Sequence, residues 1–521
     1  MWLLLVVTRG SARSGEQSRG EIGSAQAAHH ASRVRRDALF PAVALLGCAI
    51  LASTIVPVPD HGYQFYLGAQ ILDGARLYVD VAAADMHPPL FTWLAALLEA
   101  VGRVLGTDGL TLYPSTVCLI IAASLVAVWR IGPRSVFILS VMVLALLPLA
   151  GPFFGQGEQW ALVLSMPYLA AAAVDARESK ARALLPRLVI AFTAGFGLAM
   201  KPHFALVWLG IEIYLARRRG IRSLLRLECV TIGLLFVAYV VATAAFTPEF
   251  FRLLPWLMEL YPRFAPVALL DVIVDWRTAL LALGLAAGRI VKSGQDWERL
   301  ADVLSIAALA MFAAVLLQKK GWGYHWYPVN ALSVLLCAIA LRPYLESFRV
   351  LVPAMTVAAM IWMHFQIERT TRLVVSAPGY LPQMMELVEQ HARGGSIQAL
   401  THTLNVGFPL VNFTHVRWAS PYAHLWMIPA IYDRAWAGHE PFHYRRSGAW
   451  QDREQQMFDR LWEHIERENP ALILVQKPLR NGFDTRAYFA TDARFRQRFE
   501  QSVLIDSVGH YLVLGRAGET R

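Results

Sequence analysis

The ionisable residues that could move a proton or hold a phosphate lie in a few short polar segments between long apolar runs. These segments are residues 60–89, 153–159, 201–203 and 318–328. Carboxylates and imidazoles exchange protons readily, and lysine side chains near a membrane interface pair well with phosphate. Whether these segments form one site depends on the elements that carry them.

The composition indicates a polytopic membrane protein. Hydrophobic residues make up 56% of the 521 residues and charged residues only 17%, and the mean hydropathy is +0.42. One soluble core of this length cannot bury so much apolar surface, so the surplus must face lipid. The net charge of +10 would suggest nucleic acid for a soluble chain. Here the basic residues form short clusters between apolar segments, which is the positive-inside pattern, and we expect no nucleic-acid partner.

Charge also sets the expected topology. Arg33, Arg35 and Arg36 precede the first apolar run, which places the N-terminus, residues 1–37, in the cytoplasm. Its composition predicts a disordered segment. Keeping each basic cluster inside predicts about eleven spans, at residues 39–58, 110–129, 136–151, 160–174, 188–200, 204–215, 230–246, 279–290, 300–317, 329–341 and 350–364. The run 90–105 contains Glu99 and Arg103, so we interpret it as a re-entrant or interfacial helix.

Under this topology the polar segments share the extracytoplasmic face. The residues concerned are Asp60, His61, Asp80, Asp85, His87, Glu158, Lys201, His203, Lys319, Lys320 and His325. The predicted membrane interior holds very few ionisable groups, whereas a secondary transporter usually places a carboxylate or a broken helix pair near the midplane. No Walker-type phosphate loop is present. The pattern favours chemistry at the boundary between lipid and water.

The composition becomes that of an ordinary globular protein after Gln366. We expect residues 367–521 to form a soluble extracytoplasmic α/β domain. Its amphipathic and apolar patterns predict a helix at 457–468, a buried strand at 471–476 and one or two strands within 502–514.

The first outside loop carries the most specific motifs. In order they read Asp60-His-Gly-Tyr, Ala69-Gln-Ile-Leu-Asp-Gly74, Leu77-Tyr-Val-Asp80 and Asp85-Met-His-Pro-Pro-Leu90. This loop resembles that of the bacterial GT-C glycosyltransferases, and more closely the group that includes protein O-mannosyltransferases and the aminoarabinose transferases of lipid A. The segments 155–159, 200–203 and 320–325 are also similar to motifs of uncharacterised members. The resemblance covers residues 39–364.

The resemblance implies a GT-C-like transmembrane catalytic domain at residues 38–366 in the bacterial cytoplasmic membrane. The donor would be a polyprenyl-phosphate sugar, and the acceptor a glycolipid, a polysaccharide or a protein. Transfer would take place on the extracytoplasmic face with inversion at the anomeric carbon. Such a reaction needs a carboxylate that accepts the acceptor's hydroxyl proton and cationic groups that stabilise the leaving phosphate.

Two carboxylates match the acidic positions of these enzymes. Asp60 matches the base at the end of the first span, and the alternative is a cap for a helix over residues 62–72. Glu158 matches a second acidic residue that orients the acceptor or binds a metal, for which Mg²⁺ or Mn²⁺ would be suitable. Its segment, Gly155-Gln-Gly-Glu-Gln159, differs from the more usual Gly-Gln-Arg-Glu-His, and the alternative is a solvated loop carboxylate.

The remaining candidates would bind substrate. The residues assigned to the donor phosphate or the sugar are His87, Asp85, Lys201, His203, Lys320, His325 and Tyr63. Each has an alternative explanation: His87 could hold the Pro88-Pro89 turn, the lysines could anchor the chain at the interface, and Tyr63 could belong to an aromatic belt. Lys319 fits anchoring better than binding.

Two other classes of function remain open from the sequence. One is a transporter or flippase for a lipid or polysaccharide, and the other is a non-catalytic scaffold of envelope glycan assembly whose C-terminal domain recruits partners. The aspartate loop with His-Pro-Pro favours the transferase. A scaffold predicts that Asp60→Asn leaves activity in cells unchanged.

Overall fold

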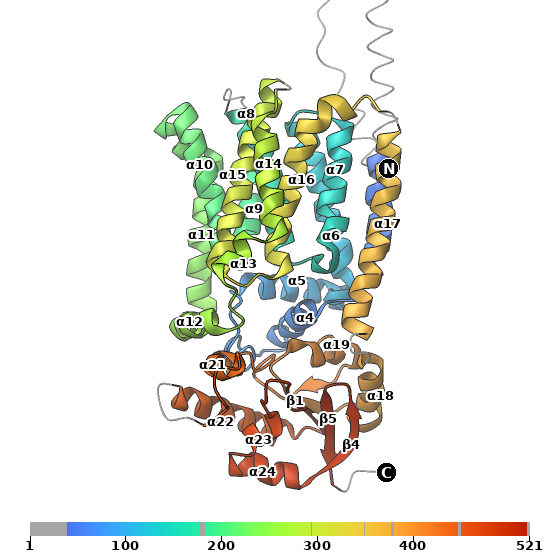
Figure 1. Cartoon of the computed structure of the whole chain (residues 1–521), viewed down its shortest axis with the longest axis vertical. Helices are drawn as coiled ribbons and strands as arrows, with labels where there is room; N and C mark the ends of the chain where they lie inside the picture. Colours follow the sequence, from blue (N-terminus) through green and yellow to red (C-terminus); the bar gives the residue numbers. More distant parts are fainter. Residues whose placement is uncertain are drawn as a thin grey trace, which may run out of the picture. The chain divides into compact units, whose positions relative to one another are not determined.

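The computed structural model describes residues 39–176, 183–292, 294–348, 350–376, 380–445 and 450–517 (Figure 1). The predicted disordered N-terminus, residues 1–37, lies outside them. The chain divides into two compact units. The bundle unit comprises Met1–Ile55, Tyr113–Val241 and Val267–Arg369, and the sheet unit comprises Val56–Leu112, Ala242–Pro266 and Thr370–Arg521.

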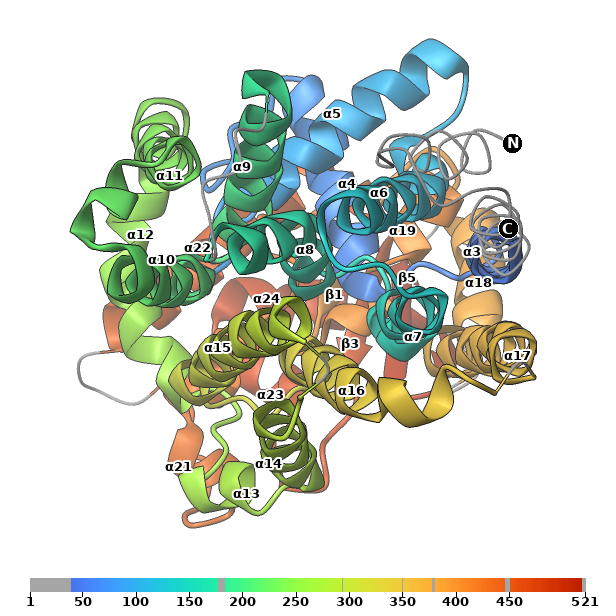
Figure 2. The ribbon, with the colours of Figure 1, turned by 90° about the horizontal axis from the view of Figure 1, so that it is seen from above.

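Helices build the bundle unit, most of them long and apolar. They are α3 (Leu39–Ala52), most of α6 (Gly109–Ile131), α7 (Val136–Leu146), α8 (Gly157–Asp175), α9 (Leu184–Ala199), α10 (Ala205–Arg219), most of α11 (Leu227–Phe246), α13 (Leu269–Ile273), α14 (Trp276–Arg289), α15 (Gln295–Gln318), α16 (Gly323–Leu345) and most of α17 (Leu351–Thr371). Short 3-10 turns join them at η1 (Pro148–Phe153), η2 (Pro202–Phe204) and η3 (Ile221–Leu225). Helices α7, α8, α15 and α16 lie side by side, and Figure 2 shows them almost end-on.

Six helices in the described part of the chain are long and apolar enough to cross a membrane. They are Gly109–Ile131, Val136–Phe153, Leu227–Phe246, Gln295–Gln318, Gly323–Leu345 and Leu351–Val375, and two shorter apolar helices are Leu39–Ala52 and Leu184–Ala199. The prediction of a helical membrane protein is therefore confirmed. The count of eleven spans stays a prediction.

Some predicted boundaries differ from the structure. The span expected at residues 39–58 is helical only to Ala52, because Pro57 and Pro59 restrict the backbone that follows. The span expected at residues 329–341 lies within α16, which begins earlier, at Gly323. The amide groups of a first helical turn need no partner within the helix, so the polar and aromatic residues before Val329 are compatible with a helix start. The outside position of residues 321–328 stays a prediction.

Buried ion pairs tie the helices of the bundle unit together. Arg226 donates to Glu212 at 2.8 Å and to Asp175 at 3.0 Å, and Arg187 donates to Glu228 at 2.7 Å. These bonds join α8, α10, the start of α9 and the start of α11. Each buried carboxylate has a cationic partner, which is the condition for keeping a charge out of water.

A five-stranded sheet forms the centre of the sheet unit. Its order is β2-β1-β3-β5-β4, with β1 (Ser396–Leu400), β2 (Arg417–Trp418) and β3 (Leu472–Gln476) parallel and β4 (Ser502–Val508) and β5 (Tyr511–Arg516) antiparallel to their neighbours. The C-terminal helices are α18 (Leu381–His391), α19 (Leu410–Thr414), α20 (Met427–Ile431), α21 (Asp433–Trp436), α22 (Gln451–Glu468), α23 (Thr485–Phe489) and α24 (Ala493–Glu500), and the short turns are η5 (Arg372–Ser376) and η6 (Leu404–Val406). The predicted helix at 457–468 and strands at 471–476 and 502–514 are confirmed.

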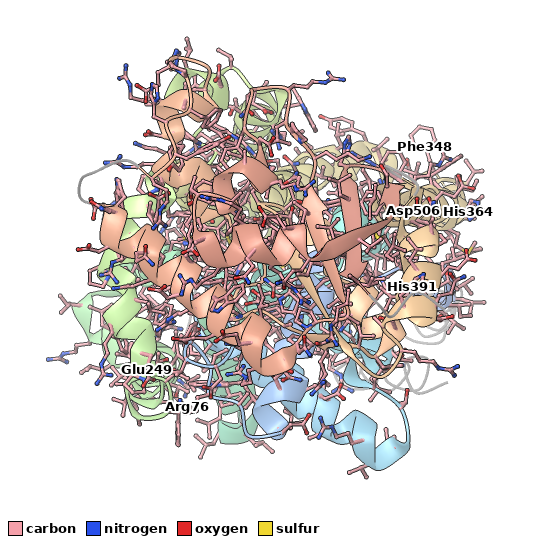
Figure 3. All side chains as sticks on the ribbon, turned by 90° about the horizontal axis from the view of Figure 1, so that it is seen from below. Arg76, Glu249, Phe348, His364, His391 and Asp506 are labelled. Atoms are coloured by element: carbon pink, nitrogen blue, oxygen red, sulfur yellow. The ribbon has the colours of Figure 1, made fainter. Side chains whose placement is uncertain are left out.

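The first loop packs into the same unit as the C-terminal residues. Helices α4 (Pro59–Leu72), α5 (Leu90–Leu105) and α12 (Glu249–Leu260), with the turn η4 (Tyr261–Arg263), belong to it. Tyr63 and Leu67 share one buried core with Phe408 and with strands β1 and β3. Arg76 of the loop also interacts electrostatically with Glu249 at the start of α12, and both are labelled in Figure 3. Residues far apart in the sequence therefore fix the shape of the loop.

The predicted helix at residues 90–105 has the expected bounds and packs on α4. A side chain at Gly68 would place its Cβ 2.6 Å from the backbone nitrogen of Ala96, so the two helices approach as closely as glycine permits. Thr92 donates to the Gln64 carbonyl oxygen at 2.6 Å across this contact. The close packing fixes α4, the helix that carries Asp60.

Candidate active site

Asp60 is the second residue of α4. The N-cap position belongs to Val58, and no side chain caps the helix there. The alternative interpretation of Asp60 as the N-cap residue is therefore wrong. A carboxylate in the first turn lies where the helix dipole stabilises negative charge.

The rest of the loop contains residues in strained backbone conformations that hydrogen bonds keep in place. Tyr78 and Ala82 have positive φ angles of 66° and 59°, and conformations of this kind cost about 1–3 kcal/mol each unless the surroundings enforce them. The backbone N–H and the side chain of Arg76 donate to Asp80 at 2.9 and 3.1 Å. The Tyr78 hydroxyl donates to the His87 carbonyl at 2.6 Å. These bonds set the position of the His87-Pro-Pro turn.

Asp85 and His87 form a close pair in this turn. The Asp85 carboxylate lies 2.9 Å from the backbone nitrogen of His87 and 2.7 Å from its Nδ1. Burial opposes ionisation of Asp85, but the charge and hydrogen bonds of His87 outweigh it and hold the pKa of Asp85 below its ordinary value. Burial and the neighbouring Asp85 raise the pKa of Tyr63. Asp85 thus orients the imidazole of His87, and Tyr63 lies beside it.

A histidine from the C-terminal part of the chain completes this cluster. The backbone N–H of Ala83 donates to the Pro421 carbonyl at 2.8 Å, and the Trp426 indole N–H donates to the Ala84 carbonyl at 2.9 Å. Between these two bonds lies His424, which interacts electrostatically with both Asp60 and Asp85, and whose pKa burial lowers to about 4. Sequence reasoning missed His424, because its local sequence carries no signal that it approaches a residue more than 300 positions away.

A second cluster lies in the bundle unit around Glu158. This side chain is 1% exposed, and its Oε1 atom lies 2.5 Å from Nζ of Lys201 and 3.7 Å from Nε2 of His325. Nζ of Lys201 also lies 5.0 Å from the centre of the Tyr324 ring. The alternative of a solvated loop carboxylate does not fit so deeply buried a group.

The turn before α8 positions Glu158. Gly155 has a φ of 86°, which glycine adopts without strain, and its N–H donates to the Gln159 side chain at 2.5 Å. That side chain in turn donates to the Leu146 carbonyl at 2.6 Å. The Gly155 carbonyl accepts a hydrogen bond from Tyr113. Glycine and glutamine of the 155–159 motif therefore build the turn, and Glu158 is the residue left to face Lys201.

The other predicted cations of the bundle unit differ in exposure. Lys320 is 2% exposed, whereas Lys319 is exposed, so only Lys319 has the surface position expected of an interfacial anchor. Burial lowers the pKa of Lys320 to about 8. Burial and the charge of Lys201 lower the pKa of His203 to about 3. His203 is thus a neutral polar group rather than a cation at neutral pH.

Comparison with known proteins bears on the fold of the chain. No family model and no curated protein matches it. Among solved structures it is similar to the crystal structure of ArnT from Cupriavidus metallidurans bound to undecaprenyl phosphate. The TM-score is 0.57 at 14% sequence identity, over 92% of this chain and 98% of that chain.

The chain has an ArnT-like fold. The likeness concerns the fold alone, and it agrees with the fold that the loop motifs led us to expect. In the sheet unit the structure brings together Asp60, Tyr63, Asp85 and His87 with His424. In the bundle unit it brings together Glu158, Lys201 and His325. The roles of these residues stay predictions.

The described residues form no ready metal-binding site. No group of three or more histidine, cysteine, aspartate or glutamate side chains among them is placed to hold an ion. Glu158, the acidic residue expected to bind a metal, is bonded to Lys201 instead. The described residues therefore offer no preformed cage for the Mg²⁺ or Mn²⁺ considered from the sequence.

Proposed function

We propose that this protein is an inverting glycosyltransferase that moves a sugar from a polyprenyl-phosphate donor to an acceptor hydroxyl on the extracytoplasmic face of the bacterial cytoplasmic membrane. The observation that carries the proposal is the fold likeness to ArnT along nearly the whole of both chains, in a structure where ArnT holds undecaprenyl phosphate. The loop motifs from Asp60 to Leu90 support it independently. The acceptor class is a glycolipid, a polysaccharide or a protein.

In the proposed reaction Asp60 is the general base. The acceptor oxygen attacks the anomeric carbon, a new C–O bond forms, and the bond from that carbon to the phosphate oxygen breaks. The acceptor's proton passes to Asp60, and the bonding electron pair leaves with the polyprenyl phosphate. A half-buried carboxylate in the first turn of a helix is a suitable base, because a developing positive charge on the attacking hydroxyl can be relieved by passing its proton to a carboxylate oxygen.

His87 takes a substrate-binding role in this proposal, and Asp85 and Tyr63 support it. The His87 ring is about half exposed, with its side chain 49% accessible, while Asp85 is only 9% accessible. A buried carboxylate bonded to Nδ1 turns the other ring nitrogen outward as the contact for substrate, in the manner of an orienting partner. Tyr63 supports Asp85 rather than stacking on a sugar, since its ring is buried against Phe408.

In this proposal, residues of the bundle unit bind the phosphate of the lipid carrier. We assign Lys201, His325 and Lys320 to that phosphate, with Lys201 as the principal charge, and His203 as a neutral hydrogen-bonding group. Glu158 is the second acidic residue of the proposed reaction. Because it is bonded to Lys201, it holds that ammonium in place, and phosphate oxygens would share the remaining N–H donors.

The test is sugar transfer by the purified full-length protein in liposomes, using a panel of polyprenyl-phosphate sugars and the three acceptor classes. We expect transfer by the wild type from at least one donor, and its loss in Asp60→Asn and Asp60→Ala. Asp73→Asn is the matched control, because Asp73 follows the same helix but is exposed and paired with Arg103. Normal transfer by both Asp60 variants would refute Asp60 as the base. Absence of transfer from every donor and acceptor would refute the proposed function.

A further inference from the structure

The three parallel strands of the sheet unit end at one edge, and each end carries polar side chains. Strand β1 is followed by Thr401 and His402, β2 is followed by the segment that holds His424, and β3 ends at Gln476. In open α/β sheets the carboxyl ends of parallel strands are the usual place for a ligand. Nothing in the proposed transfer so far uses His402, Gln476 or this edge.

The groups at this edge form a connected network of hydrogen bonds. Nδ1 of His402 lies 2.7 Å from Oε1 of Gln476, and Thr401 donates to the same oxygen at 3.1 Å. The hydroxyls of Thr403 and Tyr511 are 2.9 Å apart. Such a network fixes the positions of several donors and acceptors before any ligand arrives.

An aromatic ring flanks the network. The His402 ring packs edge-on against Trp436, with ring centres 4.9 Å apart and an angle of 72°. Trp436 is only partly buried in the hydrophobic core beside it. An aromatic side chain beside a set of hydroxyl and amide groups provides both an apolar face and hydrogen-bonding groups.

The electrostatics of the edge differ from those of the Glu158 cluster. Burial lowers the pKa values of both His402 and His424, so both imidazoles are neutral at pH 7. A neutral imidazole donates with one nitrogen and accepts with the other, which suits hydroxyl groups better than phosphate. Lys477, the cation that follows β3, already donates to the Gly509 carbonyl at 2.7 Å.

His424 has hydrogen-bonding capacity left over. Its Nδ1 atom is buried and has no hydrogen-bond partner among the described residues. Leaving a buried polar atom unsatisfied costs roughly 1–3 kcal/mol, and such atoms often mark the place of a ligand. The same imidazole interacts with Asp60 and Asp85, so a ligand here lies close to the proposed base.

We propose that this edge, termed the strand-end site and formed by His402, His424, Gln476 and Trp436, binds a polyhydroxylated sugar ring. Within the proposed function this ring is the part of the acceptor that presents its hydroxyl to Asp60. That assignment to the acceptor rests on the proposed function. The capacity of the strand-end site to bind a sugar does not depend on it.

The experiment measures sugar binding without requiring turnover. Saturation-transfer difference NMR on the full-length protein in detergent micelles would use methyl glycosides of glucose, galactose, mannose and N-acetylglucosamine as probes. We expect at least one glycoside to bind the wild type and its affinity to fall about tenfold in His424→Ala and in His402→Ala, as for one lost hydrogen bond. The more conservative His424→Gln and His402→Gln give the same comparison where an alanine variant fails to fold.

His391→Ala is the matched control. His391, which is labelled in Figure 3, ends α18 five residues before β1 begins, so it precedes the amino end of that strand in the sequence. We expect it to bind glycosides as the wild type does. Wild-type binding in the His402 and His424 variants, or the absence of binding by the wild type to all four probes, would overturn the strand-end site.

The two proposals fail separately. Asp60→Asn should abolish transfer and keep glycoside binding. If no donor supports transfer but glycoside binding is lost in the His424 variants, the proposed function falls and the strand-end site stands. If those variants lose binding of undecaprenyl phosphate while glycoside binding is unchanged, the edge belongs to the donor and the inference is wrong.

Discussion

Asp60 and Glu158 are both carboxylates at the start of a helix, yet their surroundings differ. Glu158 is almost fully buried and bonded directly to the ammonium of Lys201. Asp60 is half-buried, and the imidazole of His424 near it is neutral. Glu158 is therefore held by a buried cation, whereas Asp60 lies in the first turn of a helix and is partly accessible. Within the proposed function, this difference favours proton transfer by Asp60 and positioning of a cation by Glu158.

The largest expected effect comes from removing the base. Asp60→Asn keeps the size of the side chain and removes its basicity, so we expect the transfer rate to fall about 10²–10⁴-fold. Single-turnover transfer in liposomes measures it, with thermal unfolding to verify the fold. If Glu158→Gln lowered the transfer rate by that factor and Asp60→Asn stayed active, Glu158 and not Asp60 would be the base.

Breaking the buried pair should affect both stability and activity. Lys201→Met leaves Glu158 buried without its cation, which we expect to lower the free energy of unfolding by about 3–5 kcal/mol. The double variant Lys201→Met/Glu158→Gln removes both charges and should regain most of that stability. Thermal unfolding in detergent measures the stability of each variant, and the transfer rate of each variant is measured in liposomes.

The double variant separates positioning from catalysis. We expect it to remain slow in transfer despite its recovered stability, because the principal phosphate cation is missing. Transfer at the wild-type rate would show that the pair is only structural. Lys201→Arg retains the charge and should lie between the wild type and the double variant.

Local patterns in the sequence were sufficient for the elements but not for the site. Apolar runs and amphipathic periods predicted the helix at 90–105 and strand β3, because those signals depend on neighbouring residues. The span predicted at 329–341 is shorter than α16, since the apolar run marks only the part of the helix that follows its polar first turns. His424 could not be predicted, because its approach to Asp60 depends on how the C-terminal residues pack on the first loop. The pairing of Glu158 with Lys201 likewise depends on two helices that the sequence separates.

Removing the hydrogen bond that holds the His424 segment on the first loop is expected to have an intermediate effect on activity and stability. Trp426→Phe keeps an aromatic ring in the core and removes the indole N–H that donates to Ala84. We expect a loss of about 1 kcal/mol in stability and a larger rise in KM for the acceptor than for the donor. Steady-state kinetics with each substrate varied in turn measures the two constants. Equal changes in both would mean that the contact supports the unit as a whole and not the strand-end site.

The smallest expected effect concerns the strained turn. Tyr78→Phe removes the hydroxyl that donates to the His87 carbonyl and leaves the buried ring against Phe250. One neutral hydrogen bond contributes roughly 0.5–1.5 kcal/mol, so the variant should fold and show a modest fall in transfer. The His87-Pro-Pro turn belongs to the sheet unit, so we expect Tyr78→Phe to leave the donor binding assigned to the Glu158 cluster unchanged. Tyr324→Phe is the matched control there, since its ring packs against Lys201. Equal changes in donor binding by the two tyrosine variants would contradict the separate roles proposed for the two units. Tyr78 lies in a turn that positions only residues of the sheet unit, whereas the lipid phosphate is assigned to residues of the bundle unit.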